Sequence, residues 1–277
     1  MATRESLELL LKDSLKQLKL SAMVQEFPAV GRRARSQGSS YEQYLLELTE
    51  LEHSKRADNR LKKRLREARF PALKTLDSFD LNLAPGLNRQ LLRELAQGEY
   101  LAKGENVILL GQSGTGKTHL GIALGVEACR LGRRVYFVTA CHLVNQLVEA
   151  QEDRVLERLL RRLSQYDLLI LDELGYVPFS SKGAQLLFQV IGDRHEHKST
   201  LITTNLGFDK WPQVFGDATL TAALLDRVTH RAYIVPCNWE SVRLSQSMKH
   251  RTRQQALPAR ASKKQNSKAF GACQPNQ

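Results

Sequence analysis

Gly111-Gln112-Ser113-Gly114-Thr115-Gly116-Lys117-Thr118 matches the phosphate-binding pattern G-x-x-x-x-G-K-[ST] in full. The apolar run 106–110 before this loop predicts a short buried strand, and residues 118–124 after it predict the start of a helix. Inward-pointing backbone N–H groups and the positive end of that helix suit a nucleotide polyphosphate. We expect Lys117 to reach the β- and γ-phosphates and the Thr118 hydroxyl group to bind Mg²⁺. The loop therefore predicts a site for ATP and Mg²⁺; the alternative is an ordinary glycine-rich turn.

A second apolar run, 168–171, ends in the two carboxylates of Asp172 and Glu173. Such a run predicts a buried parallel strand, and ligands of open α/β sheets bind at the carboxyl ends of the strands. We expect Asp172 to hold Mg²⁺ through water and Glu173 to polarise the water that attacks the γ-phosphate. A solvated strand end is the alternative. The position downstream of a phosphate loop favours hydrolysis, because simple nucleotide binding would not need the adjacent glutamate.

A third strand is predicted over 199–204, where the chain is apolar and β-branched, and it is followed by Asn205. An amide at a strand tip beside the γ-phosphate can orient the attacking water. Alternatively, Asn205 caps a turn before Leu206 and Gly207, since asparagine is common there. With the two earlier motifs, the water-orienting role is preferred.

These three elements, in this order, resemble the Walker A, Walker B and sensor elements of the AAA+ ATPases. Segment 225–228 is similar to the segment that carries the arginine finger in the DnaC/DnaA branch, which implies that role for Arg227. Segment 238–243 resembles the one that ends in the second sensor, which implies nucleotide contact by Arg243, although Val242 replaces the usual aromatic residue. Segment 68–80 resembles the linker of the IstB-like ATPases, which are helper proteins encoded beside the transposase in a class of bacterial insertion sequences.

The resemblance implies an α/β fold of the P-loop AAA+ type, with a parallel five-stranded sheet flanked by helices and the phosphate-loop strand central. It implies hydrolysis of ATP to ADP and phosphate by a homo-oligomer that assembles on double-stranded DNA and assists a transposase. A DnaC-type replicative helicase loader shares these motifs and is the alternative. Glu173 and Asn205 argue against an ATP-gated DNA scaffold without hydrolysis. A small-molecule P-loop kinase would want an arginine-rich lid and an acceptor pocket, and no segment marks either one.

Composition gives the broad class. The 277 residues are 42% hydrophobic and carry a formal net charge of +12, which suggests a polyanionic partner such as nucleic acid. The four cysteines form no C-x-x-C pair, so neither a zinc site nor a disulfide framework is indicated, and a reducing cytoplasm fits. The sequence contains no long apolar run and its N-terminus does not resemble a signal peptide, so a cytoplasmic protein without a membrane partner is expected.

Four regions are predicted along the chain. Residues 1–70 form a helical domain for DNA, partner or oligomer contacts, 71–104 a linker with a short helix, 105–250 the ATPase domain, and 251–277 a basic disordered tail. Within the first region we expect a helical pattern that Phe27-Pro28 breaks, a loop at 38–40, and separate helices over 41–53 and 55–69. Strands are expected at 106–110, 135–139, 167–171, 199–204 and 232–236.

The predicted helix 55–69 is strongly basic opposite a face of Leu61, Leu65 and Ala68. A solvated face is the usual meaning of such a charge run, but the net charge and the resemblance favour contact with DNA phosphates. No element for reading bases is evident, so this contact should be largely independent of sequence. The residues assigned to it are Lys62, Lys63, Arg64 and Arg66. Elsewhere, His195 and His197 form an H-x-H pair, interpreted as a surface turn because no third metal ligand lies near it in the sequence.

Overall fold

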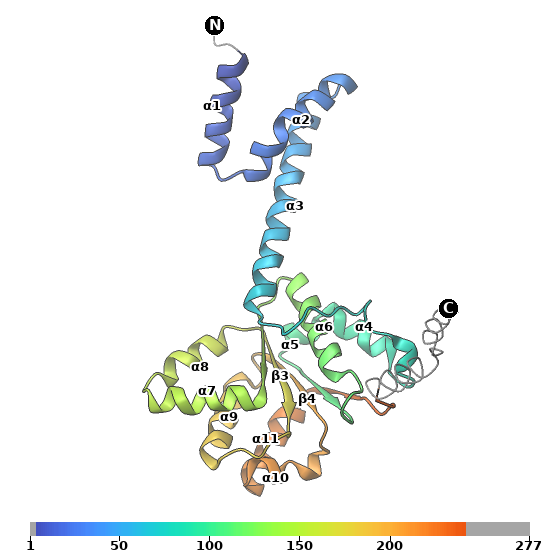
Figure 1. Ribbon diagram of the computed structural model, residues 1–277, viewed down its shortest axis with the longest axis vertical. Helices are drawn as coiled ribbons and strands as arrows, with labels where there is room; N and C mark the ends of the chain where they lie inside the picture. The colour runs from blue at the N-terminus through green and yellow to red at the C-terminus, as the bar shows by residue number, and fades with distance from the viewer. Residues whose placement is uncertain (1–3, 242–277) are drawn as a thin grey trace, which may run out of the picture.

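A computed structural model describes residues 4–241 of the 277-residue chain. Arg243, the end of the 105–250 region and the basic tail therefore lie outside the described residues. Figure 1 shows a small helical unit and a sheet domain joined by one long helix, α3. No helix between residues 4 and 241 is long and apolar enough to cross a membrane.

Five parallel strands form one sheet in the order β2-β3-β4-β1-β5, so the predicted fold class is confirmed. The middle strand is β4, whereas β1, which leads into the phosphate loop, lies between β4 and β5. The phosphate-loop strand, expected to be the middle strand, is therefore the strand next to the middle one. Because all strands are parallel, their carboxyl ends meet at one edge. The strands are β1 Asn106–Leu110, β2 Val135–Thr139, β3 Leu168–Leu174, β4 Ser199–Thr204 and β5 Ala232–Pro236.

Strand β3 is longer than the predicted 167–171. It continues through Asp172 and Glu173 to Leu174, with a register shift against β4 between Leu171 and Leu174. Such an irregularity bends the strand and changes the direction of its side chains. The two carboxylates therefore lie within the strand and not beyond its end.

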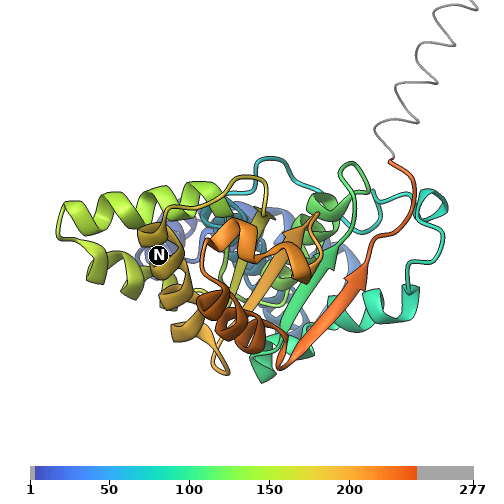
Figure 2. The same ribbon diagram turned by 90° about the horizontal axis from the view of Figure 1, so that it is seen from below.

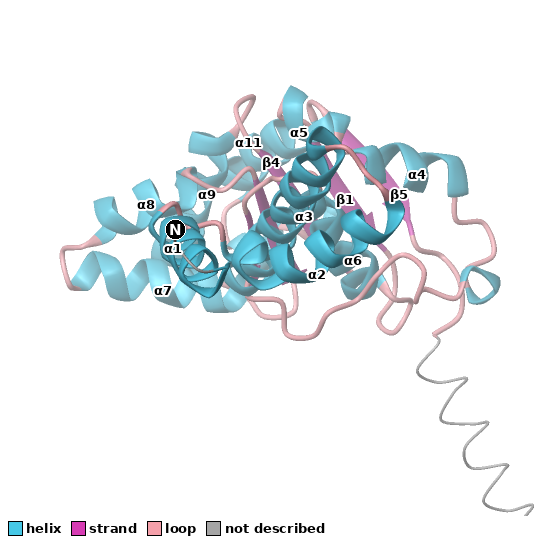
Figure 3. Cartoon of the chain, turned by 90° about the horizontal axis from the view of Figure 1, so that it is seen from above, coloured by secondary structure: helices cyan, strands magenta, loops and turns pink. Residues whose placement is uncertain are grey.

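Alternate side chains of the strands enter two apolar cores, one on each face of the sheet. Val107 and Leu109 pack with α6, α4 and α5, whereas Ile108 packs with the helices of the other face. Figure 2 shows α7 and α8 at one end of the sheet and β5 at the opposite edge, and Figure 3 shows helices on both sides of the strands. The helices of the first face are α4 Arg89–Gln97, α5 Glu99–Lys103 and α6 Lys117–Arg130; those of the second are α7 Ala140–Glu152, α8 Leu156–Ser164, α9 Ser181–Arg194, α10 Pro212–Phe215 and α11 Ala218–Thr229.

The segment expected to be a linker, 71–104, contributes to the sheet domain. It holds a 3₁₀ turn, Leu81–Leu83, as well as α4 and α5, which are two helices where one was expected. Leu95 and Tyr100 from these helices are buried in the same cluster as Val107. The segment from α4 onward is therefore part of the packed domain.

The N-terminal unit consists of α1 Arg4–Gln17, α2 Ser21–Gln37 and α3 Tyr41–Glu67. Two expectations are wrong here. Pro28 lies inside α2, because Phe27 and Val30 beside it are buried against α3 and outweigh the cost of a helical proline, which is about 3 kcal/mol. The helices expected over 41–53 and 55–69 are one continuous helix, because neither glycine nor proline interrupts the sequence between them.

A buried carboxylate fastens α2 to α3. Glu52 of α3 accepts hydrogen bonds from the backbone N–H groups of Ala22 (2.8 Å) and Met23 (3.3 Å) and from Nε of Arg56 (2.8 Å). It thereby caps α2, whose own first flanking residue, Leu20, supplies no side-chain acceptor. Burial alone would raise the pKa of Glu52, but the bonds from Arg56 and the two N–H groups hold it below its ordinary value.

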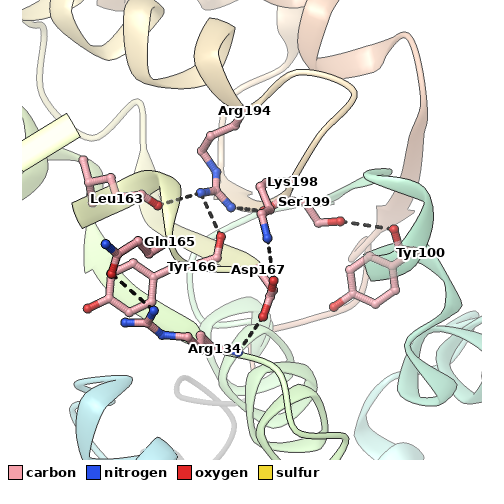
Figure 4. Close-up of polar contacts among 9 residues, drawn as sticks. All are labelled: Tyr100, Arg134, Leu163, Gln165, Tyr166, Asp167, Arg194, Lys198 and Ser199. Atoms are coloured by element: carbon pink, nitrogen blue, oxygen red, sulfur yellow. Dashed lines mark hydrogen bonds and ion pairs between the residues drawn. The ribbon is translucent and has the colours of Figure 1, made fainter. Parts of the chain in front are cut away.

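A second polar cluster closes the amino edge of the sheet, where the strands begin (Figure 4). The buried guanidinium of Arg194 donates to the carbonyl groups of Leu163 (3.0 Å), Tyr166 (3.1 Å) and Ser199 (2.7 Å). Lys198 Nζ donates to Asp167 at 2.6 Å. These bonds tie the end of α8 and the starts of β3 and β4 together, so they hold the amino edge of the sheet in place.

Candidate functional site

The phosphate loop joins β1 to α6 at the carboxyl edge of the sheet. Gly114 and Gly116 have φ values of 85° and 91°, a region that favours glycine, and a Cβ on Gly116 would lie 2.8 Å from the ring of Phe79. Nζ of Lys117 donates to the carbonyl oxygens of Gly111 (2.6 Å) and Gln112 (2.7 Å), so its ammonium group lies over the loop. The loop thus has the backbone conformation and the cation that a phosphate chain needs.

Asp172 joins the phosphate loop to two strands. Its carboxylate, only 4% exposed, accepts hydrogen bonds from Oγ1 of Thr118 (2.9 Å) and Oγ1 of Thr203 (2.6 Å). The same Thr203 oxygen accepts the backbone N–H of Glu173 at 2.9 Å. Mg²⁺ prefers oxygen ligands, such as hydroxyl and carboxylate groups, together with waters and substrate phosphates. The residues expected to hold the metal, Thr118 and Asp172, therefore fit it.

Glu173 has a left-handed backbone conformation, with φ of 58°. For a residue with a Cβ this costs about 1–2 kcal/mol, and such strain is concentrated at functional sites. The conformation places the exposed Glu173 on the cavity wall while Asp172 stays buried. The bond from its N–H to Thr203 holds this geometry.

A cavity of about 540 Å³ lies beside the phosphate loop and the carboxyl ends of β3 and β4. Its wall includes Glu173 and Asn205, so the structure brings two of the three predicted catalytic side chains to the cavity that Lys117 also lines. The other predicted residues on the wall are Ser113, Gly114, Gly116 and Thr118. Gly111, Gln112 and Thr115 shape the loop from outside the cavity; the Thr115 hydroxyl group, for instance, donates to the Gln112 carbonyl at 2.9 Å.

Residues that the sequence did not single out complete this cavity. The segment after α3 contributes Pro71, Ala72, Lys74 and Ser78 to the wall. His119 of α6 holds that segment, because its Nε2 lies 3.1 Å from both the Thr75 carbonyl and Oγ of Ser78. Thr203 was also missed, since a threonine in a β-branched strand carries no recognisable pattern.

The segment after β5 covers the back of the loop. Nε1 of Trp239 donates to the Thr115 carbonyl at 2.9 Å, and the N–H of Cys237 donates to the Leu110 carbonyl at 2.6 Å. Burial raises the pKa of the Cys237 thiol to about 11, so it stays protonated and inert. Trp239 thus packs against the phosphate loop, as its sequence position after β5 allows.

Arg227 does not join the cavity of its own chain. It lies near the end of α11, with its guanidinium carbon 4.3 Å from the ring centroid of Phe188 on α9. The carbonyl of the next residue, Val228, accepts a bond from the Asn106 side chain at 3.1 Å. Asn106 starts β1, and the phosphate loop begins at the other end of that strand, about 16 Å away for five residues. Arg227 and the cavity therefore lie at opposite edges of the sheet.

The basic residues of α3 differ in exposure. Lys62, Lys63 and Arg66 are exposed, whereas Leu61 and Leu65 pack against the sheet domain. Arg64 is half-buried, and its Nη2 lies near Gly132 in the turn after α6. The exposed pair Lys63–Glu67, at 3.9 Å, contributes little stability. Three of the four residues assigned to DNA therefore face solvent.

Comparison with known proteins adds the family. A family model described as IstB-like ATP binding protein matches residues 13–250. An ATP-binding protein of insertion sequence IS21 from Pseudomonas aeruginosa is 38% identical over 85% of this chain and 89% of its own, and one of IS5376 from Geobacillus stearothermophilus is 36% identical over 82% and 90%. Among solved structures, DnaA from Aquifex aeolicus bound to AMPPCP aligns with a TM-score of 0.53 at 20% identity, over 68% of this chain and 57% of that one. This likeness shows the fold, and the predicted parallel five-stranded sheet flanked by helices is confirmed.

Proposed function

Because the chain belongs to the IstB-like ATP binding protein family, we propose that it is an ATP-hydrolysing helper of transposition. It binds ATP and Mg²⁺ in the cavity beside the phosphate loop, assembles as a homo-oligomer that depends on ATP and DNA, and assists a transposase on double-stranded DNA. The observation that carries the hydrolytic part is the convergence of Lys117, Thr118, Glu173 and Asn205 on one cavity, with Asp172 directly behind it.

Each side chain has a role that follows from its chemistry. Lys117 neutralises the β- and γ-phosphates, and Thr118 and Asp172 hold Mg²⁺, which supplies positive charge against the phosphate oxygens. Glu173 takes the proton of the attacking water, and Asn205 orients that water. The strained backbone of Glu173 supports this assignment, because it brings a carboxylate to the cavity beside a second one that is buried.

Arg227 completes the site of a neighbouring subunit. Its place at the edge of the sheet remote from its own phosphate loop excludes a role in its own cavity and leaves it available to another subunit. An arginine finger supplied in trans stabilises the charge of the transition state and increases the rate by about 10³–10⁵. Arg231, one turn further on, is the second candidate for this role.

DNA binds to the exposed basic face of α3. Lys62, Lys63 and Arg66 contact phosphates, so the affinity is independent of sequence and falls with salt. Arg64, which is half-buried with its Nη2 near Gly132, contributes less to this contact than the three exposed residues.

The test is ATP binding and turnover in two variants of the full chain. Lys117→Ala should lose ATP affinity, because the cation of the loop is removed. Glu173→Gln should bind ATP as the wild type does and lose turnover, because the amide keeps the shape of the carboxylate without its basicity. Wild-type turnover in Glu173→Gln, or wild-type affinity in Lys117→Ala, would refute the assignment. Pull-down against the neighbouring transposase and the replicative helicase separates a transposition helper from a helicase loader.

A further inference from the structure

Three metal-ligating side chains meet at the amino edge of the sheet, away from the nucleotide cavity. His195 and Glu196 lie in the turn between α9 and β4, and His230 follows α11. One ligand atom from each lies within 4.8 Å of the other two. Of the H-x-H pair only His195 belongs to this cluster, and the second imidazole comes from His230, which is distant in sequence.

The backbone holds these residues firmly. The N–H of His195 donates to the Ile191 carbonyl at 3.0 Å, and a Cβ on Gly104 would lie 2.9 Å from the Glu196 carbonyl oxygen, so the turn is packed against a backbone that must be glycine. Glu196 has φ of 62°, which directs it out of the helical path. On the other side, the N–H of His230 donates to the Asp226 carbonyl at 2.9 Å. Two anchored backbone segments thus bring the three side chains within reach of one point.

The donor set fits zinc. Two imidazoles and one carboxylate, with bonds of about 2.0–2.2 Å, form the three-ligand sites in which zinc keeps a fourth, open position. The His195 and His230 rings have centroids 5.8 Å apart, and Nε2 of His195 lies 4.0 Å from the Glu196 carboxylate. Ligand atoms around tetrahedral zinc are about 3.3 Å apart, so rotamer changes that shift atoms by about 1 Å would close the site. His195 is half-buried and the other two are exposed, which leaves access for the ion.

We propose that His195, Glu196 and His230 form a zinc-binding site that joins the end of α11 to the turn before β4. The ion would add three bonds between segments that already pack through α9 and α11, where Arg227 stacks on Phe188. Arg227 lies one turn before His230 on the same helix, so zinc would stiffen the segment that carries the proposed finger. The site itself does not depend on the proposed function, because neither nucleotide nor DNA is needed to fill it.

The test is titration of the untagged, nucleotide-free chain with Zn²⁺ by calorimetry at mildly alkaline pH, since metal affinity depends on pH. One ion per chain should bind the wild type, and zinc should raise its melting temperature. Removal of a residue that only supports a metal ligand already weakens metal sites by about 10–100-fold, so His230→Ala should lower the affinity at least tenfold and abolish the rise in melting temperature. His230 is exposed, so this variant should fold.

Two matched controls make the result specific. His197→Ala removes an exposed imidazole two residues from His195 and should leave zinc affinity unchanged. Cys141→Ser removes the one exposed thiol among the described residues and should also have no effect. The proposal is overturned if the wild type shows no saturable binding, if His230→Ala binds zinc as tightly as the wild type, or if either control variant loses the ion.

Discussion

Thr203→Val removes one hydroxyl group that no sequence motif contains and should slow ATP hydrolysis without preventing ATP binding. Oγ1 of Thr203 donates to Asp172 at 2.6 Å and accepts the N–H of Glu173 at 2.9 Å, and the residue is 1% exposed. Valine keeps the branched shape of the side chain and removes both bonds. The change therefore isolates the hydroxyl group as the link between the two carboxylate residues.

The magnitude follows from the two bonds. A hydrogen bond to a charged group contributes about 1.5–3 kcal/mol, and a buried N–H left without an acceptor costs about 1–3 kcal/mol. The free energy of unfolding should therefore fall by about 2.5–6 kcal/mol. Only the bond from the Glu173 N–H to Thr203 holds Glu173 in position. If losing this bond raises the activation free energy by about 1–1.5 kcal/mol, the chemical step slows about tenfold, because 1.36 kcal/mol corresponds to one decade in rate.

The assay is single-turnover ATP hydrolysis together with ATP affinity and thermal unfolding. Thr203→Val should lose about a decade in rate with ATP affinity within about threefold of wild type, and Thr203→Ser should restore the rate because it restores the oxygen. Thr200→Val is the matched control: Thr200 is buried at the far end of the same strand, where its hydroxyl group accepts a bond from Nε of Arg194 at 3.3 Å. That variant should lose stability and keep the rate. A wild-type rate in folded Thr203→Val, or an equal loss in Thr200→Val, would refute the positioning role.

Three further predictions concern the rest of the molecule. Mixing Arg227→Ala subunits with Lys117→Ala subunits should recover part of the ATPase activity that each lacks alone; no recovery at any ratio, with both variants folded and assembling, would argue against a shared site. Changing the exposed residues Lys62, Lys63 and Arg66 of α3 to Gln should reduce the salt slope of duplex binding by about one unit for each DNA phosphate that is no longer neutralised, whereas Arg64→Gln should not. An unchanged slope in this triple variant would mean that the basic face of α3 is only solvated. Because the pKa of Glu52 is lowered in the folded protein, the stabilisation by this carboxylate is present above the ordinary pKa of 4.5 and is lost as the pH falls through the lower folded value. Glu52→Gln should therefore lower the free energy of unfolding by about 1.5–3 kcal/mol at neutral pH and flatten the acid side of the stability–pH curve. Glu50→Gln, at an exposed position of the same helix, should do neither.

Local sequence signals predicted the sheet well. Four of the five strands have the bounds that short apolar, β-branched runs indicated. The exception is β3, where Asp172 and Glu173 were interpreted as the end of the strand. Buried and strained carboxylates inside a strand contradict local propensity, and only the contacts from Thr118 and Thr203 make them acceptable there.

Features that depend on distant packing could not be predicted in the same way. Pro28 is tolerated in α2 because of contacts with α3, and the partner of His195 at the amino edge, His230, belongs to another helix. The stacking of Arg227 on Phe188 is equally invisible to a motif, although the motif identified the arginine itself. In each case the sequence supplies a residue type, and the tertiary fold decides what it contacts.

The basic helix and the nucleotide cavity are adjacent parts of one chain segment. The Ala68 carbonyl at the end of α3 accepts a bond from the N–H of Phe137 in β2 at 2.8 Å, so the helix ends against the edge strand of the sheet. The ring of Phe70 would lie 2.9 Å from a Cβ on Gly125, which places it directly on the backbone of α6, the helix that starts in the phosphate loop. The next residue, Pro71, forms part of the cavity wall. Any shift of α3 on DNA would therefore reach α6 and the cavity through packed contacts. Because coupling between binding sites is reciprocal, a factor by which DNA raises ATP affinity must equal the factor by which ATP raises DNA affinity.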